Sequence, residues 1–411
     1  MKKKFQIIYT LLIGFASMTA NAQVQRLPLD SVLARIRINP ALQAYDSKIR
    51  AENAYATGAR NLEAPKVSAG QYQVPYQLNP GAGSFMVEAE QMFTNPAKLR
   101  AREDYMKGTA QMNAEDKNHL KNQLIAQAKQ YYYEVAVLEK KLALVQNTQS
   151  LFEYMLKDAN IRLTYGKEKL SNIYKIKADL FELDDTREQL NNAISQRNIM
   201  LNTLMNRDKQ TAFTVDTTIV LKDYETAITD TSSLATTRSD IKRISRNIDL
   251  QQLNAKIEYS KRKPDFGLQA AHMFSYGGQP DQYILMASVT IPIVPWASKE
   301  YQANLKGICY ETQELEQKKM DILNQAEGQL AGFRSDMRSK KQQLKNYNEN
   351  IVPAEQNAYK TALLAYEQNT GDLPSVLEGI KDLQTARMNA LERLQELITI
   401  QVAYEKEMEI Y

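Results

Sequence analysis

The chain has 411 residues, with 52 basic and 48 acidic side chains and a formal net charge of +4. Residues 1–22 contain three lysines and no acidic residue, so their removal would leave a net charge of +1 (4 − 3), which excludes the basic excess typical of nucleic-acid binding. A single cysteine, Cys309, excludes disulfide bonds within the chain, and only 12 prolines and 15 glycines predict few, long elements.

The N-terminal segment has the pattern of a secretory signal peptide. Lysines precede an apolar run from Phe5 to about Met18, and small residues follow at Ala20 and Ala22. We predict a signal peptide over residues 1–22, cleaved after Ala22. No later stretch supplies the roughly 20 apolar residues of a membrane-spanning helix.

Residues 23–210 form the first of two predicted repeats. A helix-like segment that follows Asn39 leads through Pro65 into sequence with period-2 alternation. We predict a β-hairpin over about residues 65–94, because its apolar and polar side chains alternate between the two faces.

A long helical hairpin is predicted over about residues 97–205. Residues 97–263 contain no proline and only two glycines, Gly108 and Gly166. Apolar residues recur there in steps of four and three, the heptad pattern of coiled-coil packing. Gly166 is predicted to end the first helix in the left-handed conformation and so to mark the tip of the hairpin.

The second repeat is predicted over residues 236–411, after a linker over residues 211–235. It contains a helix, a β-hairpin over about residues 264–293, a long helical hairpin over about residues 297–402 and a C-terminal tail. The order of these elements is the order of the first repeat.

Matching residues support an internal duplication of about 200 residues. Pro264 corresponds to Pro65, 199 residues earlier, and Gly371 corresponds to Gly166, 205 residues earlier. Around the two tips, "KLSNIYKIKADL" aligns with "DLPSVLEGIKDL". We therefore predict Gly371 as the left-handed residue of the second tip.

The predicted strands have one apolar face. Phe85 and Phe93 lie eight residues apart, as do Phe266 and Phe274, which is roughly 26 Å along a strand at about 3.3 Å per residue. That is close to the spacing of the aromatic girdles of an outer-membrane barrel. The positions predicted to face lipid are Phe85, Val87, Phe93, Phe266, Leu268, Phe274, Tyr283, Leu285 and Val289.

The strand count favours a barrel shared between copies over two half-buried hairpins in a soluble domain. Four spanning strands cannot close a barrel, since about eight is the lower limit, and open edges cannot face lipid. Two copies would give a barrel of eight strands, packed shut by side chains, whereas three would give twelve strands and a lumen.

Several motifs, occurring in order over essentially the whole mature chain, resemble the TolC-type outer-membrane efflux proteins. They are "LPLDSVLARIRINPALQAY", "RKPDFGLQ", "TIPIVPWASKEYQANLKG" and "NIVPAEQNAYKTALLAYEQNTGDLPSVLEGIKDL". The resemblance implies an α+β membrane protein, a homotrimer with a 12-stranded transmembrane β-barrel and a periplasmic α-barrel of coiled-coil hairpins. It also implies a mixed equatorial belt, for which residues 211–225 and the C-terminal tail are the candidates.

The same resemblance implies the functional residues. Family members dock their helical tips onto a periplasmic adaptor coupled to an inner-membrane pump, and an acidic residue beyond the tip narrows the closed pore. The best match to that acidic residue is Glu378; in the first repeat Asn172 and Lys175 stand near its place. The residues matched to the docking tips are Arg162, Leu163, Tyr165, Gly166, Asn369, Gly371 and Leu373.

The implied function is export through the outer membrane, as the exit duct of a tripartite efflux pump. Type I protein secretion and heavy-metal cation efflux are alternatives for the cargo. A periplasmic coiled-coil adaptor or structural protein without a pore is the alternative from another class, although it leaves the strand hairpins unexplained.

No enzyme, cofactor or metal site is predicted. The sequence has no phosphate-binding glycine loop, nucleophile elbow or His-centred triad. Its two histidines, His119 and His272, lie 153 residues apart. Methionines near His272 (Met86, Met92, Met273 and Met286) are interpreted as apolar filling rather than as copper or silver ligands.

Overall fold

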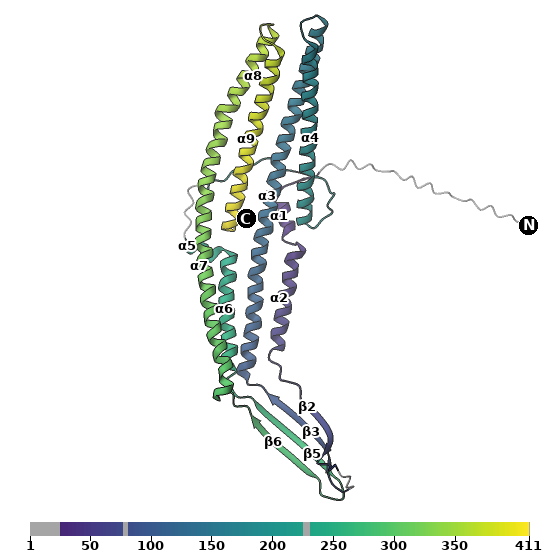
Figure 1. The fold of residues 1–411 in the computed structure, drawn as a ribbon, viewed down its shortest axis with the longest axis vertical. Helices are drawn as coiled ribbons and strands as arrows, with labels where there is room; N and C mark the ends of the chain where they lie inside the picture. Colours follow the sequence, from purple (N-terminus) through teal and green to yellow (C-terminus); the bar gives the residue numbers. More distant parts are fainter. Residues whose placement is uncertain (1–24, 77–80, 225–230, 411) are drawn as a thin grey trace, which may run out of the picture.

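The structure is a computed structural model that describes residues 25–76, 81–224 and 231–410. The predicted signal peptide and residues 225–230 of the predicted linker lie outside this part of the chain. The molecule is elongated, with long helices forming one end and a small β-sheet the other (Figure 1).

One uninterrupted helix organises the first half of the chain. Helix α3 (Pro96–Thr164) has 69 residues, which is about 100 Å at about 1.5 Å per residue. It begins where Asn95 Oδ1 accepts a hydrogen bond from Ala97 N at 3.0 Å, with a proline at the first helical position. Helix α2 (Pro40–Gly58) packs on its sheet-proximal part, and α4 (Leu170–Leu204) returns along its other part.

The second half repeats this order of elements. Helix α6 (Ser239–Ser260) packs on α7 (Pro295–Asn346), which continues through the π-helix η1 (Tyr347–Ile351) into α8 (Val352–Glu367). Helix α9 (Leu373–Met408) then returns along α8 and α7. Pro353 lies in the first turn of α8 and has no N–H to donate, which favours an irregular turn just before it.

Two strand pairs, one from each half, form a single antiparallel sheet. It contains β2 (Lys66–Tyr72), β3 (Ser84–Phe93), β5 (Phe266–Ser275) and β6 (Gln282–Val289), in the order β2-β3-β5-β6. Pairing of β3 with β5 joins the halves. Within the described residues, β2 and β6 each pair on one side only, so both edges of the sheet are open.

A second, two-stranded sheet lies near the middle of the molecule. Strand β1 (Gln25–Leu27) pairs in parallel with β4 (Phe213–Val215), beside α1 (Leu29–Ile36). The hydroxyl of Tyr132, on α3, donates to Leu27 O at 3.0 Å and accepts from Asp216 N at 2.9 Å. This buried tyrosine therefore attaches both strands to α3.

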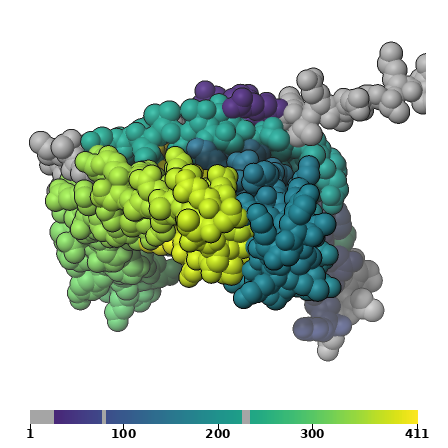
Figure 2. All heavy atoms as spheres, turned by 90° about the horizontal axis from the view of Figure 1, so that it is seen from above, coloured from purple at the N-terminus to yellow at the C-terminus, as the bar shows by residue number. Residues whose placement is uncertain are grey.

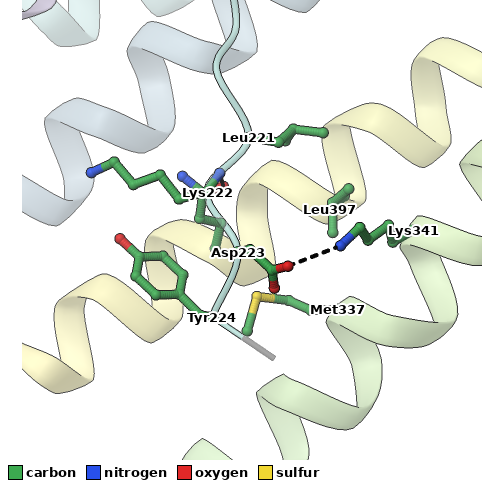
Figure 3. A pocket seen from close by; sticks show the side chains of 8 residues that line it. Leu221, Lys222, Asp223, Tyr224, Met337, Lys341 and Leu397 are labelled. Atoms are coloured by element: carbon green, nitrogen blue, oxygen red, sulfur yellow. Dashed lines mark hydrogen bonds and ion pairs between the residues drawn. The ribbon is translucent and has the colours of Figure 1, made fainter. Parts of the chain in front are cut away.

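The segment that follows β4 (residues 216–224) is held against the helices by a buried ionic network. Glu405, near the end of α9, accepts hydrogen bonds from Lys129 Nζ at 2.7 Å and from Tyr224 Oη at 2.9 Å. Burial opposes ionisation of Glu405, but these bonds hold the pKa of its carboxyl below the usual value. In Figure 3, Asp223 of this segment points toward Lys341 of α7, 3.5 Å away.

Across residues 25–76, 81–224 and 231–410, no helix is both long and apolar enough to cross a membrane. The short helix α5 (Thr231–Thr237) precedes α6 and completes the elements.

Candidate functional site: the paired helical tips and the exposed sheet

The first tip is a glycine-terminated helix end. Lys167 N donates to Arg162 O and Gly166 N to Leu163 O, each at 2.9 Å, the pattern of a Schellman motif. Gly166 has a φ of 69°, in the left-handed region. The prediction that Gly166 reverses the chain in this conformation is confirmed.

The second tip has the same hydrogen bonds but a different left-handed residue. Thr370 N donates to Ala365 O at 2.9 Å and Asn369 N to Tyr366 O at 3.1 Å. Asn369 has a φ of 57°, whereas Gly371 is not among the residues with positive φ. The prediction that Gly371 is the left-handed residue is therefore wrong, since asparagine takes this conformation here.

Gly371 is needed for a steric reason instead. A Cβ atom at this position would lie 2.9 Å from the Cβ of Ala365 and 3.3 Å from the amide nitrogen of Tyr366. The chain leaving the tip therefore passes too close to the end of α8 for any side chain. Asn369 is therefore the residue of the second tip that corresponds to Gly166 in the first, 203 residues earlier (369 − 166).

Arg162 links the two tips within one chain. Its Nη1 donates to Tyr366 O at 3.2 Å and to Asn369 Oδ1 at 3.0 Å, while its Nε donates to Asp158 at 2.8 Å. Its guanidinium also lies 4.2 Å from the ring centroid of Tyr366. Only 18% of the side chain is exposed, so Arg162 holds the hairpins together rather than presenting a free charge.

The hydroxyl of Tyr366 makes a second link between the two hairpins. The Tyr366 hydroxyl donates to Glu168 Oε2 at 3.2 Å. The other oxygen of Glu168 accepts from Lys169 N at 2.8 Å and from Asn172 Nδ2 at 2.7 Å. Burial, together with the carboxylates of Asp158 and Glu168, raises the pKa of Tyr366 well above its usual value.

Below these polar links the two hairpins share one apolar core. Leu373 is 1% exposed and lies in it, so its side chain is not available at the surface. The buried residues of this core come from α3, α4, α8 and α9: Val145, Phe152, Met155, Ala159, Ile173, Ile176, Leu183, Tyr366, Leu373, Val376, Leu377 and Ile380.

The other predicted docking residues lie at the outer end. Tyr165 is 75% exposed, and Gly166 and Asn369 are exposed beside it. Leu163 is half-buried. Four of the predicted docking residues, Tyr165, Gly166, Asn369 and Gly371, are therefore exposed at the tips.

Glu378, the predicted constriction residue, lies on α9 two turns beyond the tip. Its side chain is exposed, and it makes no hydrogen bond or ion pair with the residues that the structure describes. The adjacent Gly379 allows close packing of α9 on α8, since a Cβ there would lie 3.1 Å from Tyr359 Cα.

The sheet places the nine predicted lipid-facing residues on a single face. Phe85 is paired with Phe274, Phe93 with Phe266, and Phe266 with Val289, and directly paired residues project from the same face of an antiparallel sheet. All nine are exposed in the single chain. Strand β2, whose register the sequence left open, presents Val67 and Ala69 to this face.

The opposite face of the sheet is more polar. Glu88 and Glu90 lie on it, and Gln269 Nε2 donates to Glu88 at 2.6 Å. Met86, Met92, Met273 and Met286 share this face, with Met86 and Met273 directly paired. Among the described residues there is no group of three or more His, Cys, Asp and Glu side chains that could hold a metal ion.

Sequence reasoning missed the partners that link the tips, namely Asp158, Glu168 and Tyr366. One signal was present: Asp158 and Arg162 have the i, i+4 spacing of a helical ion pair, one turn before a predicted tip. Nothing in the sequence indicated that this arginine would bond across to Tyr366 and Asn369.

Solved structures of bacterial membrane proteins share this fold. A membrane protein from Pseudomonas aeruginosa has a TM-score of 0.76 at 14% identity, over 94% of this chain and 91% of that chain. The outer membrane protein VceC from Vibrio cholerae has a TM-score of 0.74 at 15% identity, over 92% and 95%. The Neisseria gonorrhoeae MtrE outer membrane channel, solved in its open state, has a TM-score of 0.74 at 14% identity, over 92% and 88%.

No protein-family model matches the chain, and no curated protein matches it in sequence. The likeness to solved structures therefore concerns the fold. The chain has the fold of TolC-type outer-membrane channels, mostly helical with a few strands, as the sequence motifs predict.

The Arg162 links generate the first prediction. Replacing Arg162 with Met removes hydrogen bonds between a charged donor and the second tip, each worth about 1.5–3 kcal/mol. Amide hydrogen exchange at residues 158–170 and 366–372 should accelerate at least about tenfold, while exchange in α2 and α6 stays unchanged. Arg187→Met, which removes an exposed ion pair with Asp184 on α4, is the matched control and should leave the tips protected. Equal exchange in both variants would contradict the proposed link.

Proposed function

We propose that three copies of this protein form an outer-membrane channel, the exit duct of a tripartite efflux pump. The observation that carries the proposal is the four-stranded sheet with two open edges and an exposed apolar face, set at the end of long helical hairpins. The fold that the chain shares with the outer membrane channel MtrE supports it.

The open edges favour an oligomer. An unpaired strand edge in lipid leaves backbone groups without partners, so a membrane-embedded sheet must close into a barrel. Along the order β2-β3-β5-β6 the strands alternate in direction, so β6 of one copy would meet β2 of the next antiparallel. Three copies give twelve strands and a lumen, whereas two would give a barrel filled by side chains.

The polar and apolar faces fit this arrangement. The face with Phe85, Phe274 and Leu285 would contact lipid, and the face with Glu88 and Gln269 would line the lumen. The helical hairpins would continue the lumen as a tube in the periplasm, and the 216–224 segment with the C-terminal end of α9 would form the belt around it. A signal peptide over residues 1–22 would direct export.

The tips are the proposed docking surface for a periplasmic adaptor coupled to an inner-membrane pump. Tyr165, Gly166 and Asn369 lie at the surface there, and Gly166 has open space around it. The bonds of Arg162 and Tyr366 would hold the hairpins in the closed arrangement. Glu378 from three chains would form the narrow point of the pore.

A periplasmic adaptor without a pore is the weaker candidate. It would leave the apolar face of the sheet in water, including Tyr283 at 82% and Leu285 at 68% exposure, which is a large contiguous patch for a soluble protein. Drugs, metal cations and proteins all remain candidate cargoes for the channel.

The barrel assignment predicts a sharp difference between the two faces of the sheet. Leu285→Arg would place a charge in lipid, at a cost of about 2–4 kcal/mol near the midplane. Glu88→Gln, on the opposite face, keeps the hydrogen-bonding geometry of a polar lumen. Outer-membrane trimer, measured on unheated gels, should fall strongly for Leu285→Arg and stay at the wild-type amount for Glu88→Gln. Equal amounts of trimer in the two variants would remove the lipid-facing assignment.

The docking proposal predicts loss of export without loss of assembly. Gly166→Val strains a left-handed residue by about 1 kcal/mol or more, but a Cβ atom there has nothing within 4 Å beyond the two neighbouring residues. The trimer should therefore assemble, whereas export and crosslinking of a cysteine at Tyr165 to the adaptor should both fall.

The control is Gly328→Val, a change on α7 that also has open space around it and lies far from the tips. It should leave export intact. Wild-type export by an assembled Gly166→Val trimer would show that the tip is only a turn.

A further inference from the structure

A recess between the two hairpins contains a buried carboxylate that its own chain leaves half-bonded. The recess has a volume of about 280 Å³ and lies between α4 and α9, with α3 behind it. Seen from above the tips, α9 (yellow) and α4 (dark teal) lie side by side (Figure 2).

The carboxylate belongs to Asp179, which is 4% exposed. One of its oxygens accepts a hydrogen bond from Lys381 Nζ at 2.6 Å. The other, Oδ2, has no hydrogen-bond partner within the described chain. A buried charged oxygen without a partner costs free energy, and such atoms are uncommon unless a ligand, ion or water completes them.

The remaining lining combines an apolar floor with a polar rim. Phe152 and Leu183, 1% and 6% exposed, form the floor together with Met388. Glu182 lies exposed at the rim. The two carboxylates outnumber the single ammonium of Lys381, so the recess has a net negative charge.

We propose that this recess binds a small organic cation that bears an N–H ammonium group on an apolar ring or chain. The ammonium donates to Asp179 Oδ2, a charge-assisted bond that the protein itself does not make. The apolar part lies on Phe152 and Leu183. The volume is just below the range of about 300–1,000 Å³ typical of ligand sites, which suits one ring and a short amine rather than a larger molecule.

The recess lies on the side of α9 that is opposite the 216–224 segment. Lys381 and Met388 line the recess, whereas Leu394 and Gln401 lie under the 216–224 segment, and at about 3.6 residues per turn these pairs occupy opposite sides of α9. If that segment is the outer belt, the recess faces the tube interior, farther from the tips than Glu378. This location rests on the proposed function, but binding of the cation does not.

The test measures binding of 2-phenylethylammonium to the purified full-length protein by titration calorimetry, with the neutral 2-phenylethanol as the matched ligand. The ammonium should bind and the alcohol should not. Asp179→Asn should weaken binding by about tenfold or more, because it removes the charged acceptor. Asp382→Asn, which neutralises an exposed carboxylate on the same helix, should change the affinity by less than about twofold.

A second variant, expected to bind the ammonium more tightly, distinguishes loss of the site from misfolding. Lys381→Met removes the ammonium that competes for Asp179 and should tighten binding. Equal binding of the alcohol, an unchanged affinity in Lys381→Met, or no binding at all would overturn the proposal, the last result meaning that water alone completes Asp179.

Conductance of the same preparation in planar bilayers separates this inference from the proposed function. A conducting trimer that does not bind the ammonium would contradict the proposed cation site but not the proposed channel. A protein that binds the ammonium through Asp179 but does not conduct would contradict the proposed channel but not the cation site.

Discussion

The unpaired edges of the four-stranded sheet constrain everything else in this molecule. Strands β2 and β6 each expose a row of backbone donors and acceptors, and the face between them is apolar and exposed. Water can form hydrogen bonds with the strand edges but is an unfavourable environment for the apolar face. Lipid suits the apolar face but offers no hydrogen-bond partners to the edges. The proposed pairing between copies within a membrane would satisfy both, and the alternating strand directions are compatible with it.

The long helices connect the sheet to the tips at the far end of the molecule. Helix α3 is continuous from the sheet to the first tip, and it contacts α2, α4, α6 and α9 along the way. The network around Glu405 attaches the end of α9 to α3 at mid-length, and Arg162 joins the hairpins again at the tips. Breaking a buried ion pair such as Lys129–Glu405 costs about 3–5 kcal/mol. The two halves of the chain are thus joined both at mid-length and at the tips, where an apolar core lies beneath the polar links.

Local periodicity predicted the elements well. The alternation in strands β3, β5 and β6 identified the exposed face residue by residue, because a period of two leaves only two choices and the aromatic positions select one. Gly166 was predicted correctly because a lone glycine in a long helical stretch has few other uses. Gly371 was predicted to be needed for a positive φ, which was wrong. A glycine is needed there because a Cβ would lie too close to Ala365 across the turn. The bond from Arg162 to Tyr366 and the burial of Asp179 depend on how two hairpins 200 residues apart meet, which helical periodicity within either hairpin does not encode.

Intersubunit pairing of β6 with β2 is the central claim, and disulfide scanning between these edges tests it most directly. In a Cys309→Ser background, one cysteine at Ala69 of β2 would be combined in turn with one at Tyr283, Leu285, Ala287 or Val289 of β6. After oxidation in outer membranes, at least one combination should give covalent trimer, because each chain would be joined to both neighbours. Covalent dimer as the only product, or no product from any of the four combinations, would contradict a closed barrel of three copies.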